Sequence, residues 1–115
     1  MPRPTKGRRV CDLPINNRFG PFNQKVDPER IVEMSVDEYE TIRLIDYEGM
    51  IQEECASQMN VARTTVQRIY DNARKKLADS IVNNKLLVIQ GGEYELCTDK
   101  EDGFRCRRCR RRGQI

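Results

Sequence analysis

Residues 52–70 read QEECASQMNVARTTVQRIY, and this stretch predicts two helices joined by a tight turn. Apolar side chains recur at helical spacing on both sides of the turn: Cys55, Met59, Val61, Val66 and Ile69. Ala56 has only a methyl group, so the second helix can cross close above the first. Asn60 can adopt the left-handed backbone that the tight turn requires. Together these features predict a helix-turn-helix.

The second helix of the pair carries side chains suited to reading DNA. With Val66 and Ile69 facing inward, the polar residues near its start face outward: Arg63, Thr64, Gln67 and Arg68. Arginine pairs with guanine N7 and O6, glutamine pairs with adenine N6 and N7, and threonine reaches a base edge or a thymine methyl group. The further candidate contacts with DNA are Gln52, Arg74, Lys75 and Lys76. The alternative is an ordinary helical hairpin inside a core, which needs the same apolar spacing.

Composition predicts one small domain with an uneven charge distribution. The 115 residues are 37% hydrophobic and carry a net charge of +3. Residues 61–76 contain five basic residues and one acidic residue, whereas residues 27–60 contain two basic and ten acidic residues. A polyanion would therefore be bound by one face only. The sequence has no long apolar span and no apolar signal region near its start, so we expect no membrane contact and a cytoplasmic location.

Two more helical features extend the motif into a domain of residues 35–85. Ser35 and Glu38 have the spacing of a capping box, and Gly49 marks the end of the helix that begins there. The second motif helix continues at helical spacing to Asn83 and Asn84, so it is roughly 20 residues and 30 Å long. The apolar positions near its end are Leu77, Ile81 and Val82. These side chains need a partner, which is either the amino-terminal segment or another subunit.

The segments on either side are predicted to be less regular. Residues 1–34 form a basic, proline-rich arm in which Arg8 and Arg9 contact phosphates or a minor groove, or else are simply solvated. A short strand is expected over residues 10–15. Residues 86–96 predict a β-hairpin with a turn at Gly91 and Gly92. That hairpin would pair Ile89 with Tyr94 and Leu87 with Leu96, and its apolar face would cover the helices or join two subunits.

The five cysteines indicate thiols or metal ligands rather than a disulfide framework, because their number is odd and no export signal precedes them. In the tail of residues 97–115, Cys106 and Cys109 form a C-x-x-C pair, which supplies half of a tetrahedral zinc site. Cys97 is a candidate third ligand and Cys11 a candidate fourth. The alternatives are a redox pair and a basic tail with incidental cysteines. Cys55 belongs to the motif core.

Three stretches carry a resemblance to a known family: RRVC at 8–11, the segment from SVDEYETIRL to SIVNNK at 35–85, and LLVIQGGEYEL at 86–96. They resemble the domain-of-unknown-function family number 134, predicted DNA-binding proteins of bacteria and archaea. The resemblance implies a three-helix unit similar to region 4 of bacterial sigma factors. Where such proteins usually have Ser or Thr before each motif helix, this sequence has Ile51 and Ala62, which predicts weak helix caps.

The expected fold is therefore mainly α, with a three-helix, sigma-region-4-like unit, a small β-hairpin and irregular basic tails. The expected function is sequence-specific binding of double-stranded DNA by a homodimer, as a transcriptional regulator. The alternative is an RNA-binding or RNA-polymerase-interacting module that uses the sigma-like helices and the arginine-rich tail. No enzyme is expected, because the sequence lacks histidine, a glycine-rich phosphate loop and a nucleophile with a placed base.

Overall fold

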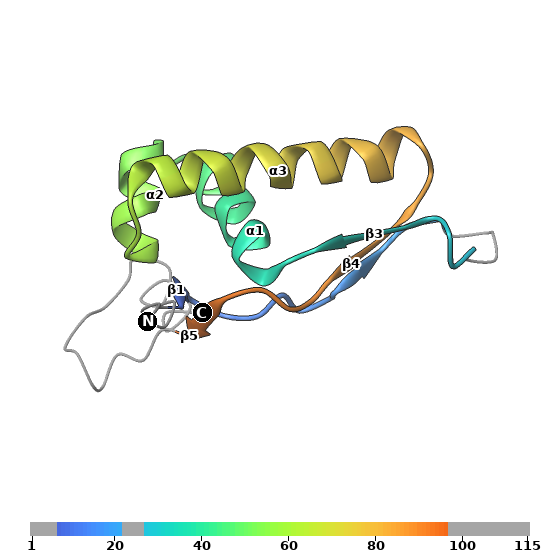
Figure 1. Cartoon of the computed structure of the whole chain (residues 1–115), viewed down its shortest axis with the longest axis horizontal. Helices are drawn as coiled ribbons and strands as arrows, with labels where there is room; N and C mark the ends of the chain where they lie inside the picture. The colour runs from blue at the N-terminus through green and yellow to red at the C-terminus, as the bar shows by residue number, and fades with distance from the viewer. Residues whose placement is uncertain (1–6, 22–26, 97–115) are drawn as a thin grey trace, which may run out of the picture.

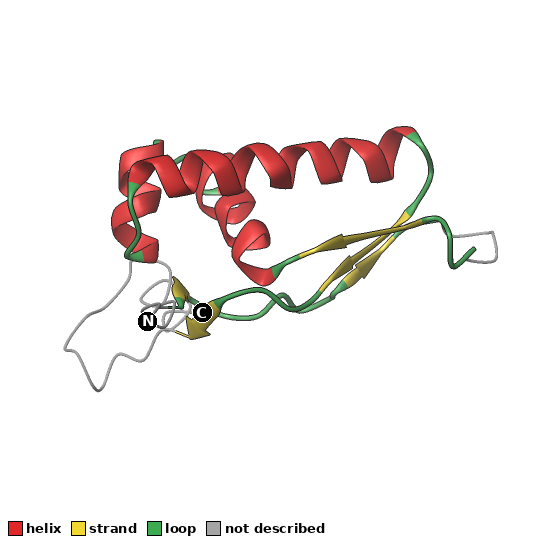
Figure 2. Cartoon of the chain, viewed as in Figure 1, coloured by secondary structure: helices red, strands yellow, loops and turns green. Residues whose placement is uncertain are grey.

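The computed structural model of the chain describes residues 7–21 and 27–96 (Figure 1). The fold is mainly helical, with short strands that form two small sheets (Figure 2). The elements, in chain order, are β1 (Arg8–Val10), β2 (Arg18–Phe19), β3 (Ile31–Met34), α1 (Val36–Thr41), the π-helix η1 (Ile42–Tyr47), α2 (Gln52–Met59), α3 (Arg63–Val82), β4 (Leu86–Ile89) and β5 (Tyr94–Leu96).

The first helix begins where the capping box predicted. The Ser35 side chain accepts the Glu38 backbone N–H, and the Glu38 carboxylate accepts the Ser35 N–H, so two unpaired donors of the first turn are satisfied. After Thr41 the helix widens into η1, in which the Glu48 N–H donates to the Arg43 carbonyl at 2.9 Å. Gly49 ends this helix with a φ of +81°, as its position in the sequence predicted.

The two helices predicted from residues 52–70 are both present. Asn60 lies between α2 and α3 in the left-handed conformation, with φ 61° and ψ 47°. Its successor, Val61, donates its N–H to the Ala56 carbonyl at 3.0 Å, which closes the turn. α3 is 20 residues long, and Asn84, with φ 56°, turns the chain into β4. The predicted length and end of this helix are confirmed.

The predicted hairpin of residues 86–96 is wrong. β4 is the central strand of a three-stranded sheet, parallel to β3 and antiparallel to β2, whereas β5 pairs in parallel with β1. Gly91 and Gly92 carry the chain past the start of α1 instead of reversing it. The Gly91 carbonyl accepts the Val36 N–H, and a Cβ on Gly92 would lie only 2.4 Å from an Asp37 carboxylate oxygen.

The amino-terminal segment, predicted as an irregular arm over residues 1–34, contains regular strands. Within its described residues it supplies β1, β2 and β3, and so one strand of one sheet and two strands of the other. The strand expected over residues 10–15 instead spans Arg8–Val10. The tail of residues 97–115 lies outside the described residues.

Two apolar clusters form the interior. The first lies between the sheet and α3, and its buried members are Val10, Val32, Met34, Val36, Ala73, Leu87 and Ile89. The second joins η1, α2 and the start of α3, and its buried members are Leu44, Cys55, Ala56, Met59 and Val66. Leu87 and Ile89 therefore belong to the core and cannot form the intersubunit face that the hairpin would have offered. At the far end of α3, Ile81 and Val82 remain exposed.

Among the helices that the structure describes, none combines the length and the apolar character needed to cross a membrane.

Candidate nucleic-acid interface

The turn at Asn60 fixes how α3 is attached to α2. Cys55, Met59 and Val66 are fully buried between the two helices. Ala56 is also buried, and its small side chain is in the same apolar cluster as Val66 of α3. Because both helices share one close-packed cluster, the direction of α3 is determined by the core.

One side of α3 is buried, and this places the candidate DNA contacts on the other side. The buried residues recur at helical spacing: Val66, Ile69, Tyr70, Ala73 and Ser80. The four residues predicted to face outward are all exposed, and all lie in the first two turns: Arg63, Thr64, Gln67 and Arg68. We call these four residues the reading row. The structure thus brings together the main candidate site residues on one exposed helix surface.

Gln52, the first residue of α2, contacts the reading row. Its side-chain oxygen accepts a hydrogen bond from Arg63 Nη1 at 3.3 Å. This bond joins the first residues of α2 and α3 at the surface. It orients the Arg63 guanidinium and leaves its other N–H groups able to bind bases or phosphates.

The basic residues farther along α3 have different surroundings. The Arg74 guanidinium lies 5.5 Å from the centre of the Tyr70 ring and 4.0 Å from Asp46 Oδ2. Tyr70 Oη donates to Asp46 Oδ1 at 2.8 Å, and burial together with this hydrogen bond raises the pKa of Tyr70. Lys75 is exposed, whereas Lys76 forms an ion pair of 2.7 Å with Glu38. Arg74 and Lys75 can therefore meet phosphates, while Lys76 links α3 to α1.

Arg8 and Arg9 lie on β1 and not on α3. Both are half-buried in β1, which pairs with β5. Arg8 Nη1 lies 3.0 Å from Glu93 Oε2 and 3.8 Å from Asp37 Oδ2. The charge of Arg8 is thus used to join β1 to the turn before β5 and to the start of α1.

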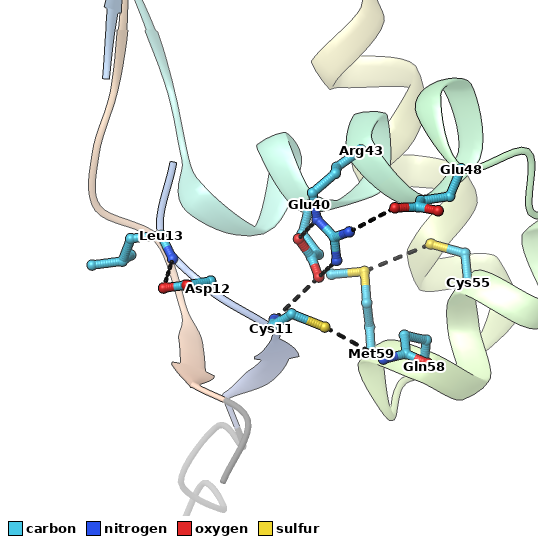
Figure 3. Close-up of polar contacts among 9 residues, drawn as sticks. All are labelled: Cys11, Asp12, Leu13, Glu40, Arg43, Glu48, Cys55, Gln58 and Met59. Atoms are coloured by element: carbon cyan, nitrogen blue, oxygen red, sulfur yellow. Dashed lines mark hydrogen bonds and ion pairs between the residues drawn. The ribbon is translucent and has the colours of Figure 1, made fainter. Parts of the chain in front are cut away.

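A buried ionic group behind the helix pair was not predicted from the sequence. Arg43 of η1 donates two hydrogen bonds to the Glu40 carboxylate, and its Nη1 lies 3.6 Å from Glu48 (Figure 3). Burial alone would lower the pKa of Arg43, but the hydrogen bonds and charge of Glu40 raise it above its ordinary value, so the guanidinium stays charged. The spacing of Glu40 and Arg43, three residues apart on a helix, is the sequence signal that could have indicated the pair.

The same carboxylate holds the amino-terminal segment against the helices. Glu40 Oε2 accepts the backbone N–H of Cys11 at 3.2 Å, and Gln58 of α2 donates to the Cys11 sulfur at 3.5 Å (Figure 3). The segment after β1 therefore supports both α1 and the first helix of the motif. This contact connects the position of α2, and through it α3, to the amino-terminal part of the fold.

The cysteines predicted as zinc ligands are mostly outside the described residues. This is the case for Cys97, Cys106 and Cys109, while Cys11 is half-buried beside Gln58. Across residues 7–21 and 27–96 no three His, Cys, Asp or Glu side chains are grouped so that they could hold a metal ion. Cys55 is a core residue, as predicted, and burial followed by the charge of Glu40 raises the pKa of its thiol to about 12.

The chain is similar to a family of known proteins. The family model described as "Protein of unknown function DUF134" matches residues 1–97. A UPF0251 protein of Desulfitobacterium hafniense (strain Y51) is 63% identical over 103 residues, which cover 90% of this chain and 82% of the relative. A UPF0251 protein of Caldicellulosiruptor bescii is 50% identical over 94 residues, covering 82% of this chain and 65% of the relative.

A more distant UPF0251 protein, from Thermoanaerobacter sp. (strain X514), is 42% identical over 105 residues, which cover 91% of this chain and 93% of the relative. No solved structure matches the chain. The family model covers the reading row and both apolar clusters. The chain therefore belongs to the DUF134 family of proteins of unknown function.

Proposed function

We propose that the protein binds double-stranded DNA in a sequence-specific manner and acts as a transcriptional regulator. The observation that carries the proposal is the reading row, defined above as Arg63, Thr64, Gln67 and Arg68. These side chains are exposed together at the start of a helix whose opposite side is buried. Arginine, glutamine and threonine are the residue types that recognise guanine, adenine and thymine in the major groove.

The arrangement of the helices supports a helix-turn-helix related to region 4 of sigma factors. α2 is the first helix of the motif and α3 the second, and the left-handed residue Asn60 lies between them. α1 and η1 pack against α3 and supply the third helix that a helix-turn-helix needs to bury its apolar side. With side chains a helix is about 10–12 Å wide, and the major groove is about 12 Å wide, so the exposed start of α3 fits the groove.

Charge along α3 favours this mode of binding. Arg63 and Arg68 are followed on the exposed side by Arg74 and Lys75, which would contact phosphates. Asp71 is the one acidic residue of residues 61–76, and it lies on the exposed side. The net positive charge of this stretch would attract DNA to the side of the molecule on which α3 is exposed.

The proposal includes a homodimer on the DNA. A single reading helix contacts only a few base pairs, and one small module makes too few phosphate contacts for tight specific binding at physiological salt. Two copies related by a two-fold axis would read two half-sites about one helical turn, roughly 34 Å, apart.

Selection of bound duplexes from a random pool tests the proposal. We expect enrichment of a two-fold symmetric sequence, with binding that weakens steeply as salt is raised. The matched control is the chain shortened after residue 104, which lacks the arginine-rich tail but keeps α3. Retention of the same consensus by the shortened chain supports reading by α3. Absence of any consensus, together with stronger retention of single-stranded RNA that depends on the tail, would favour the RNA-binding alternative.

A further inference from the structure

The sheet formed by β2, β4 and β3 has one face that no described helix covers. α3 lies on the face that carries Leu87 and Ile89, and all described helices lie to that side (Figures 1 and 2). The opposite face carries the alternate residues of each strand and contains a hollow of about 470 Å³. Its lining residues are Asn17, Arg18, Ile31, Glu33, Val88 and Gln90. We call this surface the outer sheet face.

A row of three residues crosses the outer sheet face from one edge to the other. Arg18 of β2 is paired with Val88 of β4, and Val88 is in turn paired with Glu33 of β3. Neighbouring strands are about 4.8 Å apart, so the backbones of Arg18 and Glu33 are about 10 Å apart. Both side chains are exposed, and within residues 7–21 and 27–96 neither forms an ion pair. A positive and a negative charge thus flank Val88, which is itself buried.

In the next row, the two edges of the face differ in the size of their side chains rather than in charge. Ile31 of β3 is paired with Leu86 and is 40% exposed, so it projects from one edge of the face. Gly20, beyond the end of β2, lies against Leu86 on the other side and has no side chain to project; a Cβ there would lie 2.9 Å from the Leu86 Cα. One edge therefore has a protruding apolar side chain, whereas at the other edge the Leu86 side chain fills the space beside Gly20, with its Cδ1 also 2.9 Å from that Cβ position.

We propose that a second copy of this chain docks on the outer sheet face, related to the first by a two-fold axis parallel to β4. Such an axis exchanges the two edges of the sheet. Arg18 then faces Glu33 of the partner subunit, and Ile31 faces the edge that carries the partner's Gly20. The interface is self-complementary in charge, as a two-fold contact requires.

The charge pattern also selects this axis over the other two-fold axis in the plane of the interface. An axis running across the strands would place Arg18 opposite the partner's Arg18 and Glu33 opposite the partner's Glu33. Like charges in direct opposition across an interface are strongly unfavourable. Of the two face-to-face arrangements, only the axis parallel to β4 brings opposite charges together.

This dimer is one arrangement of the homodimer that the proposed function includes, and to that extent it builds on the proposed function. Stacked sheets are about 10 Å apart, and a helix packed on each outer side adds about 10 Å per side, so the two α3 axes would be about 30 Å apart. α3 runs away from α2 while β4 runs back toward it (Figure 1). Rotation about an axis parallel to β4 therefore leaves the two α3 amino termini at the same end of the dimer, with the reading rows on its two outer sides.

Sedimentation equilibrium without DNA tests the interface separately from DNA binding. The variants are Arg18→Glu, Glu33→Arg and the double variant that carries both changes, with Glu53→Arg on exposed α2 as the matched control. We expect the full-length chain to dimerise in the micromolar range, since the sheet face is small. Each single change should raise the dimer dissociation constant about tenfold or more, and the double variant should return to within about threefold of the parent, because the exchanged charges again face each other.

Three results would overturn the interface. One is a monomer at every concentration up to about a millimolar. Another is unchanged association of both single variants. The third is a double variant that is folded, as shown by circular dichroism and an unchanged melting temperature, yet associates no better than the single variants. If association instead depends on Ile81 and Val82, as Ile81→Ser would reveal, the end of α3 is the interface and the outer sheet face is not. Failure of DNA binding by a chain that still dimerises would leave the interface intact and reject only the proposed function.

Discussion

Arg43 and Glu40 form a two-point ion pair inside the protein, with hydrogen bonds of 2.7 Å from Nε to Oε1 and 2.6 Å from Nη2 to Oε2. Glu40 is fully buried and Arg43 nearly so. Arg43→Met would leave the Glu40 carboxylate buried without its counter-charge, so we expect the free energy of unfolding to fall by about 3–5 kcal/mol. Urea denaturation followed by circular dichroism measures this change.

The double variant Glu40→Met with Arg43→Met distinguishes the effect of the unpaired charge from the effect of changed packing. Removing both charges removes the unpaired carboxylate, so the double variant should be more stable than Arg43→Met alone. Glu53→Ala on the surface of α2 is the control and should stay within about 0.5 kcal/mol of the parent chain. Equal losses in the single and double variants would show that packing, rather than the unpaired charge, controls stability at this position.

Replacement of reading-row residues should change which sequence is bound. Gln67→Ala, Arg63→Ala and Arg68→Ala should each weaken binding to the preferred duplex by about 1–3 kcal/mol and relax the preference at one base position. Lys75→Ala is the comparison, since a phosphate contact should weaken all duplexes alike and lower the salt slope by about one. Competition binding against single-base variants of the selected duplex distinguishes the two patterns. A uniform loss in all four variants would make the reading row a phosphate-binding surface.

A side-chain cap at the start of α3 should stabilise the protein. Ala62 has the extended backbone of a cap residue, with φ −71° and ψ 151°, but makes no side-chain hydrogen bond to the first turn. Ala62→Ser would supply the missing acceptor, and we expect a gain of about 0.5–2 kcal/mol in the free energy of unfolding. Ala78→Ser, at an exposed position within the same helix, should instead lose a few tenths of a kcal/mol. A melting temperature that falls in both variants would argue against this backbone as a cap.

Cys55 should make the protein less stable at high pH. Burial raises the pKa of its thiol from 9.0 to about 12, so the unfolded chain loses this proton before the folded chain does. The contribution is fully present below pH 9 and is lost as the pH rises toward 12. We expect the difference in unfolding free energy between the parent chain and Cys55→Ala to shrink across that range. A difference that is constant with pH would show that the thiol does not titrate in this way.

Local sequence signals predicted the helical part of this fold and of the candidate site. Ser35 with Glu38, Gly49 and Asn60 each determine one backbone feature within a few residues, and each lies where the sequence indicated. The outward position of Gln67 followed from the inward position of Val66, because both are set by one helical period.

The strand pairing could not be predicted in the same way, because it depends on which distant segments pair with the edges of β4. Gly91 and Gly92 have the sequence of a hairpin turn, yet two earlier strands occupy both edges of β4 and leave β5 to pair with β1. Nor did the sequence indicate that Arg43 would be buried, because a charged side chain is expected at the surface unless it is paired. Its buried environment depends on Glu48 and Cys11 as well as on Glu40, which are close only in the folded chain.

The parallel pairing of β1 with β5 has a consequence for how the protein is made. A ribosome releases the amino terminus first, so Arg8 has to wait for its partner Tyr94 until nearly all the described chain has been synthesised. The helices from Ser35 to Val82 depend mostly on neighbours close in sequence and can form during that interval. Biogenesis would therefore proceed through a nascent chain whose helical half is already assembled, while the exposed strands β2 and β3 remain available to chaperones until β4 emerges.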